Sequence, residues 1–301
     1  MPLNPVAAQI NELVMSARAD APPPTVALMR EGWETLIGQV ATESTSCDVQ
    51  PIDVAGMPSL SFTPAEPNGS LLVWFHGGGW VIGSPSLAVN EVDRLCAASG
   101  CRGISVGYRL APEHPFPGPQ LDAIAAASWC IERADALGID PRRVAVGGDS
   151  AGGNLAAVAA QRVAGLAAQV LVYPSCDQRE SWRATAPHQG GYILEAASIQ
   201  WFLDQSRGKV EFEDPIVSPL LASDDVLREV PPACIITAEY DPLRADGATY
   251  ARRLRDLGVH VEEAHFEEEM HAFFSMTEVL EDARLAAAIA AAFLVAQLGP
   301  G

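Results

Sequence analysis

The stretch from which the fold can be inferred reads Val144-Ala145-Val146-Gly147-Gly148-Asp149-Ser150-Ala151-Gly152-Gly153. The apolar run at 143–147 predicts a strand, and the alanine-rich pattern over 151–164 predicts a helix directly after it. Between them lies a GxSxG pattern, which is typical of a serine held on a sharp, strained turn from strand to helix. The positive end of that helix would then point at Ser150. Because the chain holds 25 glycines, GxSxG also arises by chance, so a simple glycine-rich turn remains open on this motif alone.

A second glycine-rich segment, His76-Gly77-Gly78-Gly79-Trp80, follows another apolar run. Three consecutive glycines leave the backbone without side chains, so that amide N–H groups can approach a developing negative oxygen closely. We therefore expect an oxyanion hole beside the serine, made by the amides of Gly77, Gly78 and Ala151. We expect His76 to brace this loop by hydrogen bonding rather than to act as a base. Neither glycine segment fits GxGxxG, and no P-loop is present, so a nucleotide site is not expected.

Two further polar residues each follow a predicted strand. Asp241 lies after the apolar run 233–238, and His271 lies after the run 259–266. With Ser150 they give the chain order Ser, Asp, His, each at the carboxyl end of a strand. We predict that His271 is the general base and that Asp241 orients it. The rivals are interpreted as structural, because they lie within a strand, on its other face, or one turn into the next helix: His260, His265, Glu239 and Asp246.

The rest of the chain alternates short apolar runs with helical patterns, which predicts a mainly parallel sheet covered by helices on both faces. The predicted strands are 58–62, 71–75, 101–106, 143–147, 168–173, 233–238 and 259–266. The predicted helices are 87–99, 119–136, 151–164, 245–257 and one from 272 to about 297. Two amphipathic stretches, 6–18 and 25–40, indicate an appended helical piece at the N-terminal end. Residues 177 to 213 interrupt the alternation with aromatic residues and no clear strand, which suggests an insertion over the sheet.

Composition excludes several classes of protein. The 301 residues are 49% hydrophobic and carry a net charge of −19, so the chain is globular and its field repels nucleic acid and acidic membranes. Its first residues lack a signal-peptide pattern, and no run of about 18 apolar residues could span a bilayer, so we expect a soluble, cytoplasmic protein. The six cysteines are scattered, and we expect reduced thiols and no metal site.

Taken together, five motifs resemble those of the hormone-sensitive-lipase family of α/β-hydrolases, the bacterial family IV esterases. They are HGGGW, the run Tyr108 to His114, GGDSAGGN, DPL and HAF, and the match covers roughly residues 47 to 298. The resemblance implies an α/β-hydrolase fold with an eight-stranded, mostly parallel sheet. It also implies a helical cap made from 1–46 and 177–213, over a catalytic core made from 47–176 and 214–301. One departure, Gly118-Pro119-Gln120, affects only local loop shape.

The implied activity is that of a serine carboxylesterase, which hydrolyses short to medium acyl esters through an acyl-enzyme and needs no cofactor. A lactone or an amide could use the same triad, and a ligand-binding receptor on this fold is an alternative of another class. Four cap and loop aromatics are expected either to bind substrate or to form a small core of their own: Trp80, Tyr192, Trp201 and Phe202. The resemblance further implies a homodimer through the last strand, around Val259 to Phe266, for which the residues give no independent support.

Three consecutive acidic residues, Glu267, Glu268 and Glu269, come shortly before His271. One interpretation is a solvated acidic loop, since exposed charges are weakly coupled to their neighbours. The alternative is that these carboxylates favour the imidazolium form and raise the pKa of His271. The two interpretations differ in whether the carboxyl groups are exposed.

Overall fold

The computed structural model describes residues 1–19, 23–40, 45–184, 188 and 190–299. Within them, eight strands form a single sheet in the order β1-β2-β4-β3-β5-β6-β7-β8. All neighbours from β4 to β8 are parallel, and β1 and β2 are antiparallel additions at one edge. The strands are β1 (Asp48–Val54), β2 (Met57–Thr63), β3 (Leu71–Phe75), β4 (Arg102–Val106), β5 (Val144–Asp149), β6 (Ala168–Val172), β7 (Ala233–Tyr240) and β8 (Val261–Met270).

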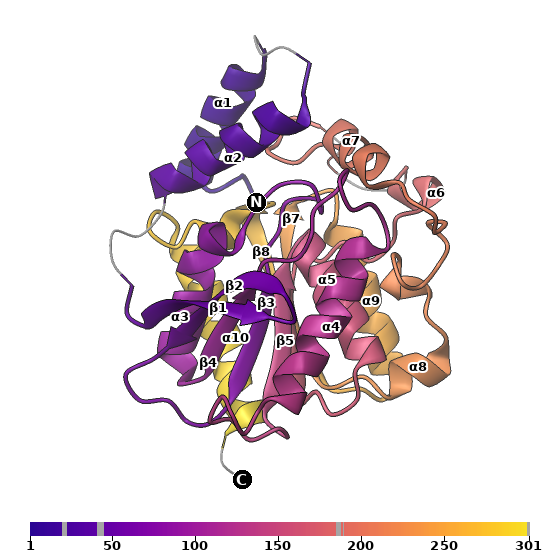
Figure 1. Cartoon of the computed structure of the whole chain (residues 1–301). Coiled ribbons are helices and arrows are strands. Elements are labelled where there is room, and N and C mark those ends of the chain that lie inside the picture. Colours follow the sequence, from indigo (N-terminus) through magenta and orange to yellow (C-terminus); the bar gives the residue numbers. More distant parts are fainter. Residues whose placement is uncertain (20–22, 41–44, 185–187, 189, 300–301) are drawn as a thin grey trace.

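Helices cover both faces of the sheet (Figure 1). On one face α3 (Val89–Ser99) lies beside α10 (Glu281–Leu298). On the other face α4 (Gly118–Glu132) packs beside α5 (Ala151–Arg162), and α9 (Arg244–Asp256) packs against β7 and β8. The short helix α8 (Asp224–Arg228) lies farther along the second side, and 3₁₀ turns span Pro85–Ala88, Pro219–Leu221 and Phe273–Ser275. The predicted fold class is therefore confirmed: a mostly parallel eight-stranded sheet between two helical layers.

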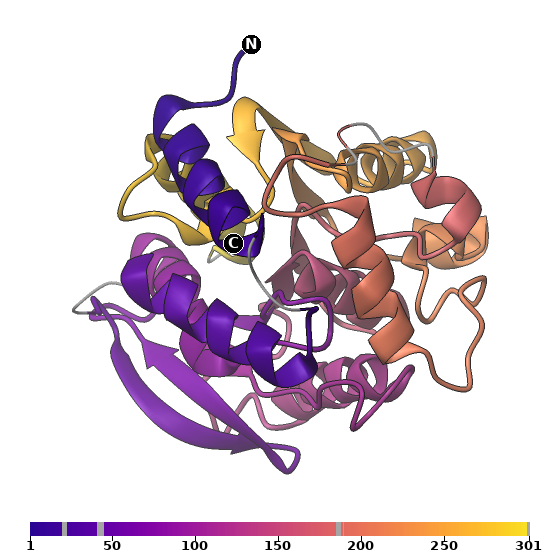
Figure 2. The same ribbon diagram turned by 90° about the horizontal axis from the view of Figure 1, so that it is seen from above.

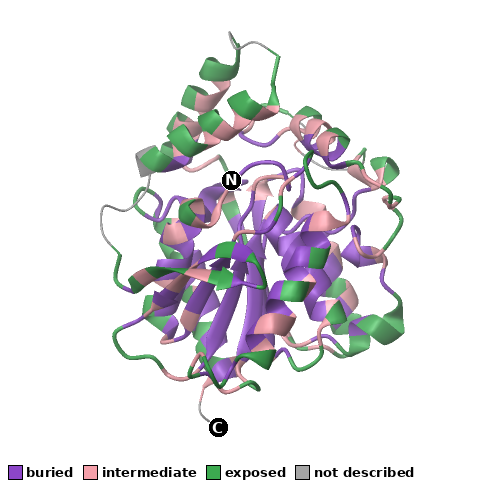
Figure 3. Cartoon of the chain, in the orientation of Figure 1, coloured by how far each residue is buried: buried purple, intermediate pink, exposed green. Residues whose placement is uncertain are grey.

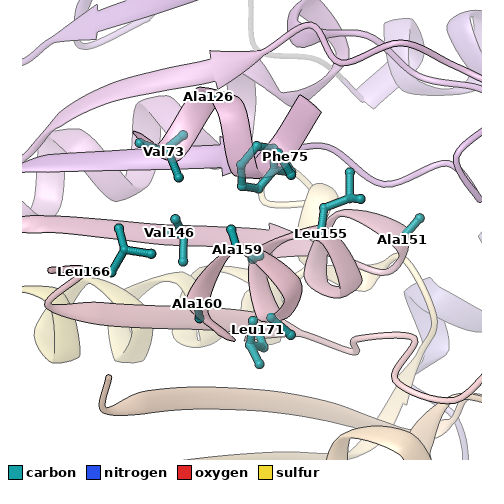
Figure 4. Close-up of a cluster of buried hydrophobic side chains, with 14 of the residues drawn as sticks. Val73, Phe75, Ala126, Val146, Ala151, Leu155, Ala159, Ala160, Leu166 and Leu171 are labelled. Carbon is teal, nitrogen blue, oxygen red and sulfur yellow. The ribbon is translucent and has the colours of Figure 1, made fainter. Parts of the chain in front are cut away.

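Strand β3 shows why both faces are buried. Side chains alternate across a strand, and in β3 Val73 and Phe75 join the core under α4 and α5 while Trp74 joins the core under α3 and α10. Figure 4 shows Phe75 near Leu155 of α5, and Val73 near Val146 of β5, in the first of these cores. An uninterrupted apolar run such as LLVWF is what a strand with two covered faces requires. Figure 3 shows the central strands buried, with exposure on the edge of the sheet and on the outer helix faces.

Two differences from the predicted elements have clear causes. Strand β1 was not predicted, because it is a mostly exposed edge strand containing Pro51; it joins β2 through a two-residue turn, Ala55-Gly56, with positive φ at both positions. The last helix begins at Glu281 rather than at residue 272, since Ala272 adopts a left-handed conformation and a 3₁₀ turn follows it. Two acidic residues in the first turn of α10 complement the helix dipole.

Four helices lie outside the sheet layers: α1 (Pro5–Ala19), α2 (Val26–Val40), α6 (Glu180–Arg183) and α7 (Ala196–Ser206). Of these, α1, α2 and α7 lie above the edge at which the parallel strands end, and Figure 2 shows them around that edge from above. The side chains of α1 reach the segment before α7, where Asn11 Nδ2 donates to Gly191 O and Arg18 Nη1 donates to Ile193 O. The N-terminal helices and the insertion are thus in direct contact over the strand ends.

Candidate active site

Ser150 lies between β5 and α5 with a positive φ of 57° and a ψ of −116°. A side chain other than glycine is strained in such a conformation, so the surrounding structure must hold it there. The turn is also closely packed. A Cβ at Gly152 would come within 1.8 Å of the carbonyl oxygen of Phe75, and one at Gly148 would come within 2.4 Å of Gly152. Both glycines of the GxSxG pattern are therefore required by close backbone approach.

Three residues from distant parts of the chain meet at this serine. Each lies one position beyond the end of its strand: Ser150 after β5, Asp241 after β7 and His271 after β8. His271 Nε2 is 2.9 Å from Ser150 Oγ, and His271 Nδ1 is 2.7 Å from Asp241 Oδ2. Asp241 is fully buried, and its other oxygen accepts the N–H of Leu243 at 2.7 Å. This arrangement can pass the hydroxyl proton to the imidazole while the carboxylate holds the ring.

The rival acids are occupied elsewhere. Glu239 pairs with His265 Nε2 at 2.9 Å and with Arg244. Asp246 is buried and accepts hydrogen bonds from two backbone amides in the loop after β6 and from the indole of Trp182. Neither has a hydrogen bond to His271, so Asp241 is the acid that contacts the imidazole.

The predicted role of Gly77 in an oxyanion hole needs correction. Its N–H donates to Asp149 Oδ1 at 2.7 Å, so this proton is directed at a carboxylate and is not available to a substrate oxygen. Gly78 and Gly79 instead line the same cavity as Ser150 and Ala151, and both have positive φ. The sequence predicted that this loop lies beside the serine, but only the fold shows which of its glycines line the cavity at Ser150. The candidate donors are therefore the amides of Gly78, Gly79 and Ala151.

A cavity of about 80 Å³ opens at Ser150 and His271. Its walls are mostly apolar and come from the strand-end loops, from α2 and from the segment around α7; they include Met29, Trp33, Trp80, Ile82, Ile193, Leu194, Ile199, Phe202 and Leu243. Arg18 of α1 also lines it. A hydrophobic cavity of this kind beside a serine can hold the acyl or alcohol part of a small substrate.

Two of the four aromatics predicted to bind substrate lie elsewhere. Trp80 and Phe202 line the cavity, whereas Tyr192 and Trp201 do not. The Tyr192 ring contacts the rings of Tyr240 and His188 near the end of β7, and the Trp201 ring packs edge-on against Phe202. The sequence analysis missed Met29 and Trp33, although the amphipathic pattern over 25–40 marked a helix with an apolar face that had to be covered.

Comparison with known proteins shows which family this chain resembles. Residues 72–275, which are more than half of the chain, match the family model described as alpha/beta hydrolase fold. The chain belongs to this family. The hydrolase is 40% identical over 226 residues to ethyl acetate hydrolase of Pseudomonas putida, an alignment that covers 71% of this chain and 69% of the relative. It is 39% identical over 219 residues to carboxylesterase NlhH of Mycobacterium tuberculosis, covering 70% and 68%.

Solved structures agree over almost the whole length. A hyperthermophilic esterase from the archaeon Pyrobaculum calidifontis superposes with a TM-score of 0.88 at 34% identity, covering 98% of this hydrolase and 99% of that chain. An alpha/beta hydrolase from the metagenome of Lake Arreo superposes with a TM-score of 0.90 at 33% identity, covering 99% of both. The predicted family and the predicted class, carboxylic ester hydrolase, are thereby confirmed.

The loop of the hydrolase that carries the three glycines is braced by His76. Its Nδ1 lies 2.7 Å from the carbonyl oxygen of Gly77, and its ring stacks on Tyr108 with 4.3 Å between centroids. The Tyr108 hydroxyl in turn donates to the carbonyl oxygen of His76. Burial lowers the pKa of His76 to about 4, so the ring is neutral at neutral pH and its Nδ1–H can donate to Gly77. His76 has no hydrogen bond to the triad.

The acidic run before His271 fits neither of its two interpretations fully. All three glutamates lie in β8, and Glu269 is completely buried while Glu267 is exposed. Burial, followed by the nearby charges of Asp282 and Glu268, raises the pKa of Glu269 to about 8. The side chain is therefore neutral at pH 7 and adds no negative charge beside His271. The expectation of a fully solvated loop is wrong for Glu269.

The described residues also bear on metals and membranes. Among them, no group of three or more histidine, cysteine, aspartate or glutamate side chains is placed to hold a metal ion. In the same part of the chain, no helix combines the length and the hydropathy needed to cross a bilayer.

Proposed function

We propose that the chain is a serine carboxylesterase in which Ser150, His271 and Asp241 form the catalytic triad. His271 Nε2 takes the hydroxyl proton as Ser150 Oγ attacks the ester carbonyl, and Asp241 holds the ring with its Nδ1–H directed at the carboxylate. The proton then passes to the leaving alcohol, and an acyl-enzyme remains. Water attacks this ester with His271 again accepting a proton, which releases the carboxylic acid and restores the serine.

The amides of Gly78, Gly79 and Ala151 are proposed to bind the oxyanion of each tetrahedral intermediate. Their support is their position around Ser150 in one cavity, together with the start of α5, whose positive end faces the serine. In comparable sites, the loss of one such donor costs about 2.7 to 4 kcal/mol of transition-state stabilisation.

The single observation that carries the proposal is the continuous chain of contacts from Ser150 Oγ through His271 to Asp241, opening into an apolar cavity. We infer short to medium acyl esters as substrates. The cavity of about 80 Å³ is small beside the roughly 300 to 1,000 Å³ of sites for drug-sized ligands. One relative, ethyl acetate hydrolase of Pseudomonas putida, is named for an ester of this kind.

We further propose that residues 1–46 and 177–213 act as a cap over a core of 47–176 and 214–301. The support is that α1 and α2 contribute Arg18, Met29 and Trp33 to the cavity wall, and the segment around α7 contributes Phe202. A cytoplasmic location and a homodimer through β8 belong to the proposal as well. β8 is the last strand of the sheet and pairs with β7 on one side. Size-exclusion chromatography with light scattering tests the dimer.

The activity is tested with p-nitrophenyl esters. Release of p-nitrophenol from the acetate and butyrate should fall on the order of 10⁶-fold in kcat for Ser150→Ala, leaving only the contribution of binding and oxyanion donors. A panel that includes a lactone and an anilide separates ester hydrolysis from lactonase or amidase activity. Binding of ester without any turnover in the wild-type chain would instead support a receptor and reject the proposal.

A further inference from the structure

A second, smaller cavity adjoins the proposed active site. Its volume is about 10 Å³, close to the space that one water molecule occupies. Trp33 and Asp149 line both this cavity and the substrate cavity, and Glu91 lines only the smaller one. The carboxyl groups of Glu91 and Asp149, the residue that precedes Ser150, therefore line one water-sized space.

Both carboxyl groups accept hydrogen bonds from the loops that position the triad. Asp149 Oδ1 accepts the N–H of Gly77, and a Cβ at Gly77 would lie 2.2 Å from Asp149 Oδ2, so the carboxylate is in contact with the loop of three glycines. Glu91 Oε1, on α3, accepts the hydroxyl of Ser275. Ser275 ends the 3₁₀ turn that follows His271. Together these contacts connect the oxyanion loop, the serine turn and the histidine loop.

Ionising both Glu91 and Asp149 would cost much more free energy than ionising one of them. Glu91 is 2% exposed and Asp149 is 6% exposed, and two adjacent buried anions repel each other strongly. Burial raises the pKa of Glu91 to about 8, with the Asp149 charge adding to it, and burial raises the pKa of Asp149 to about 6. Glu91 Oε2 has no hydrogen-bond partner among the described residues. Because Oε1 accepts from Ser275, Oε2 is the atom expected to carry the proton.

Three of the four titratable groups packed around the pair carry no charge that could offset a second anion. His76 is neutral because burial lowers its pKa to about 4. Burial raises the pKa values of the Tyr108 and Tyr173 phenols well above their usual range, so both stay neutral. His271 is the fourth: its imidazolium form favours the Asp149 anion and lowers the pKa of that carboxyl group, in opposition to burial.

We propose that Glu91 is a positioning residue whose protonated carboxyl group, through a water in the second cavity, donates to the Asp149 carboxylate and so fixes Gly77 and the oxyanion loop. Loss of this proton above about pH 8 places two anions side by side behind Ser150. They disfavour the developing oxyanion and weaken the hold on the loop, so kcat falls at alkaline pH. This inference rests on the proposed function of Ser150.

The protonation of Glu91 is measured without turnover, by infrared spectroscopy of the carbonyl stretch of carboxylic acids in the resting protein. We expect Glu91→Gln to remove at pH 7 a protonated-carboxyl band that in the wild type disappears as pH passes about 8. The matched control is Glu269→Gln, another buried glutamate whose pKa is raised, which should remove a different band. Identical spectra for wild type and Glu91→Gln at pH 7 would mean that Glu91 is ionised, and would overturn the inference whatever the fate of the esterase proposal.

The pH profile of kcat tests the consequence. Glu91→Gln should keep kcat at pH 7 within about twofold of wild type, because the amide can donate as the acid does, and should lose the decline above pH 8. Glu91→Ala should lower kcat at least tenfold with KM changed less than threefold, since the oxyanion contacts are made only in the transition state. An alkaline decline that persists in Glu91→Gln, or that disappears in Glu269→Gln instead, contradicts the inference. If Glu91→Ala does not fold, the pH profile of Glu91→Gln still tests the inference.

Discussion

Replacement of Asp241 by asparagine tests the orientation of the triad most directly. Asp241 Oδ1 accepts the N–H of Leu243 at 2.7 Å, and Oδ2 faces His271 Nδ1 at 2.7 Å. In the asparagine variant the amide oxygen should remain on the Leu243 N–H, which is a fixed donor. The amide NH₂ would then face Nδ1 and force the imidazole to carry its proton on Nε2, where it can no longer accept the proton of Ser150.

The opposite orientation of the amide restores the useful tautomer at a calculable cost. It places NH₂ against the Leu243 N–H, so two donors face each other in a fully buried site. A buried unsatisfied donor costs about 1 to 3 kcal/mol, which lowers the competent fraction by roughly 5- to 150-fold. Loss of the carboxylate charge that stabilises the imidazolium adds to this. We expect a total fall in kcat of roughly 10³- to 10⁴-fold, in the range seen when a triad aspartate is replaced in this way.

The assay is the hydrolysis of p-nitrophenyl butyrate at pH 7.5 to 8, with the thermal midpoint measured for each variant. Asp246→Asn is the matched control, since Asp246 is also a buried aspartate that accepts backbone N–H groups but does not contact His271. The control should keep kcat within about tenfold of wild type. The reasoning is refuted if Asp241→Asn retains a tenth or more of wild-type kcat while folded, or if Asp246→Asn has the larger effect.

Three further outcomes are expected. Gly152→Ala should lose most activity and stability, because its Cβ would lie 1.8 Å from the Phe75 oxygen; a variant with wild-type kcat and thermal midpoint would disprove the close approach. Phe202→Ala should shift kcat/KM toward longer p-nitrophenyl esters, whereas Trp201→Ala, outside the cavity, should not, and equal shifts would contradict the cavity walls. The pKa of His76 is about 4 in the folded state, below the unfolded value near 6.5. The free energy of unfolding should therefore decrease as pH falls from about 6.5 to about 4, by at most about 1.4 kcal/mol per pH unit for this group. His76→Asn should flatten that slope in urea titrations at pH 4 to 7, and an unchanged slope would assign the titration to another group.

Strand positions in the parallel part of the sheet could be predicted from sequence because their physics is local. A strand buried on both faces needs an apolar run, and LLVWF supplies one; a residue just beyond such a run must lie at the carboxyl edge. Ser150, Asp241 and His271 were found by this argument. Strand β1 was missed because an exposed edge strand with a proline lacks that signal.

The walls of the site could not be predicted in the same way. A side chain's burial in a strand follows from one-residue alternation, but the partner of a helix face depends on how distant segments pack. Trp33 and Phe202 come from segments about 170 residues apart, and both line the cavity. The sequence patterns of both segments indicated helices, but neither pattern showed that the two helices would lie close together in the fold. Trp201 and Phe202 are adjacent in sequence, and only the rotation of α7 decides which of them reaches the cavity.

The correction at Gly77 shows that the two glycine motifs form one structural unit. Asp149 occupies the variable position before Ser150 in GxSxG, yet its carboxylate takes the first amide of the three-glycine loop. That contact decides which amides remain for a substrate oxygen, because a donor held at 2.7 Å by a buried carboxylate gains nothing by leaving it. The charge of Asp149 is therefore a condition for the shape of the proposed oxyanion site. A neighbouring group that controls that charge, as we infer for Glu91, acts on catalysis without contacting the substrate.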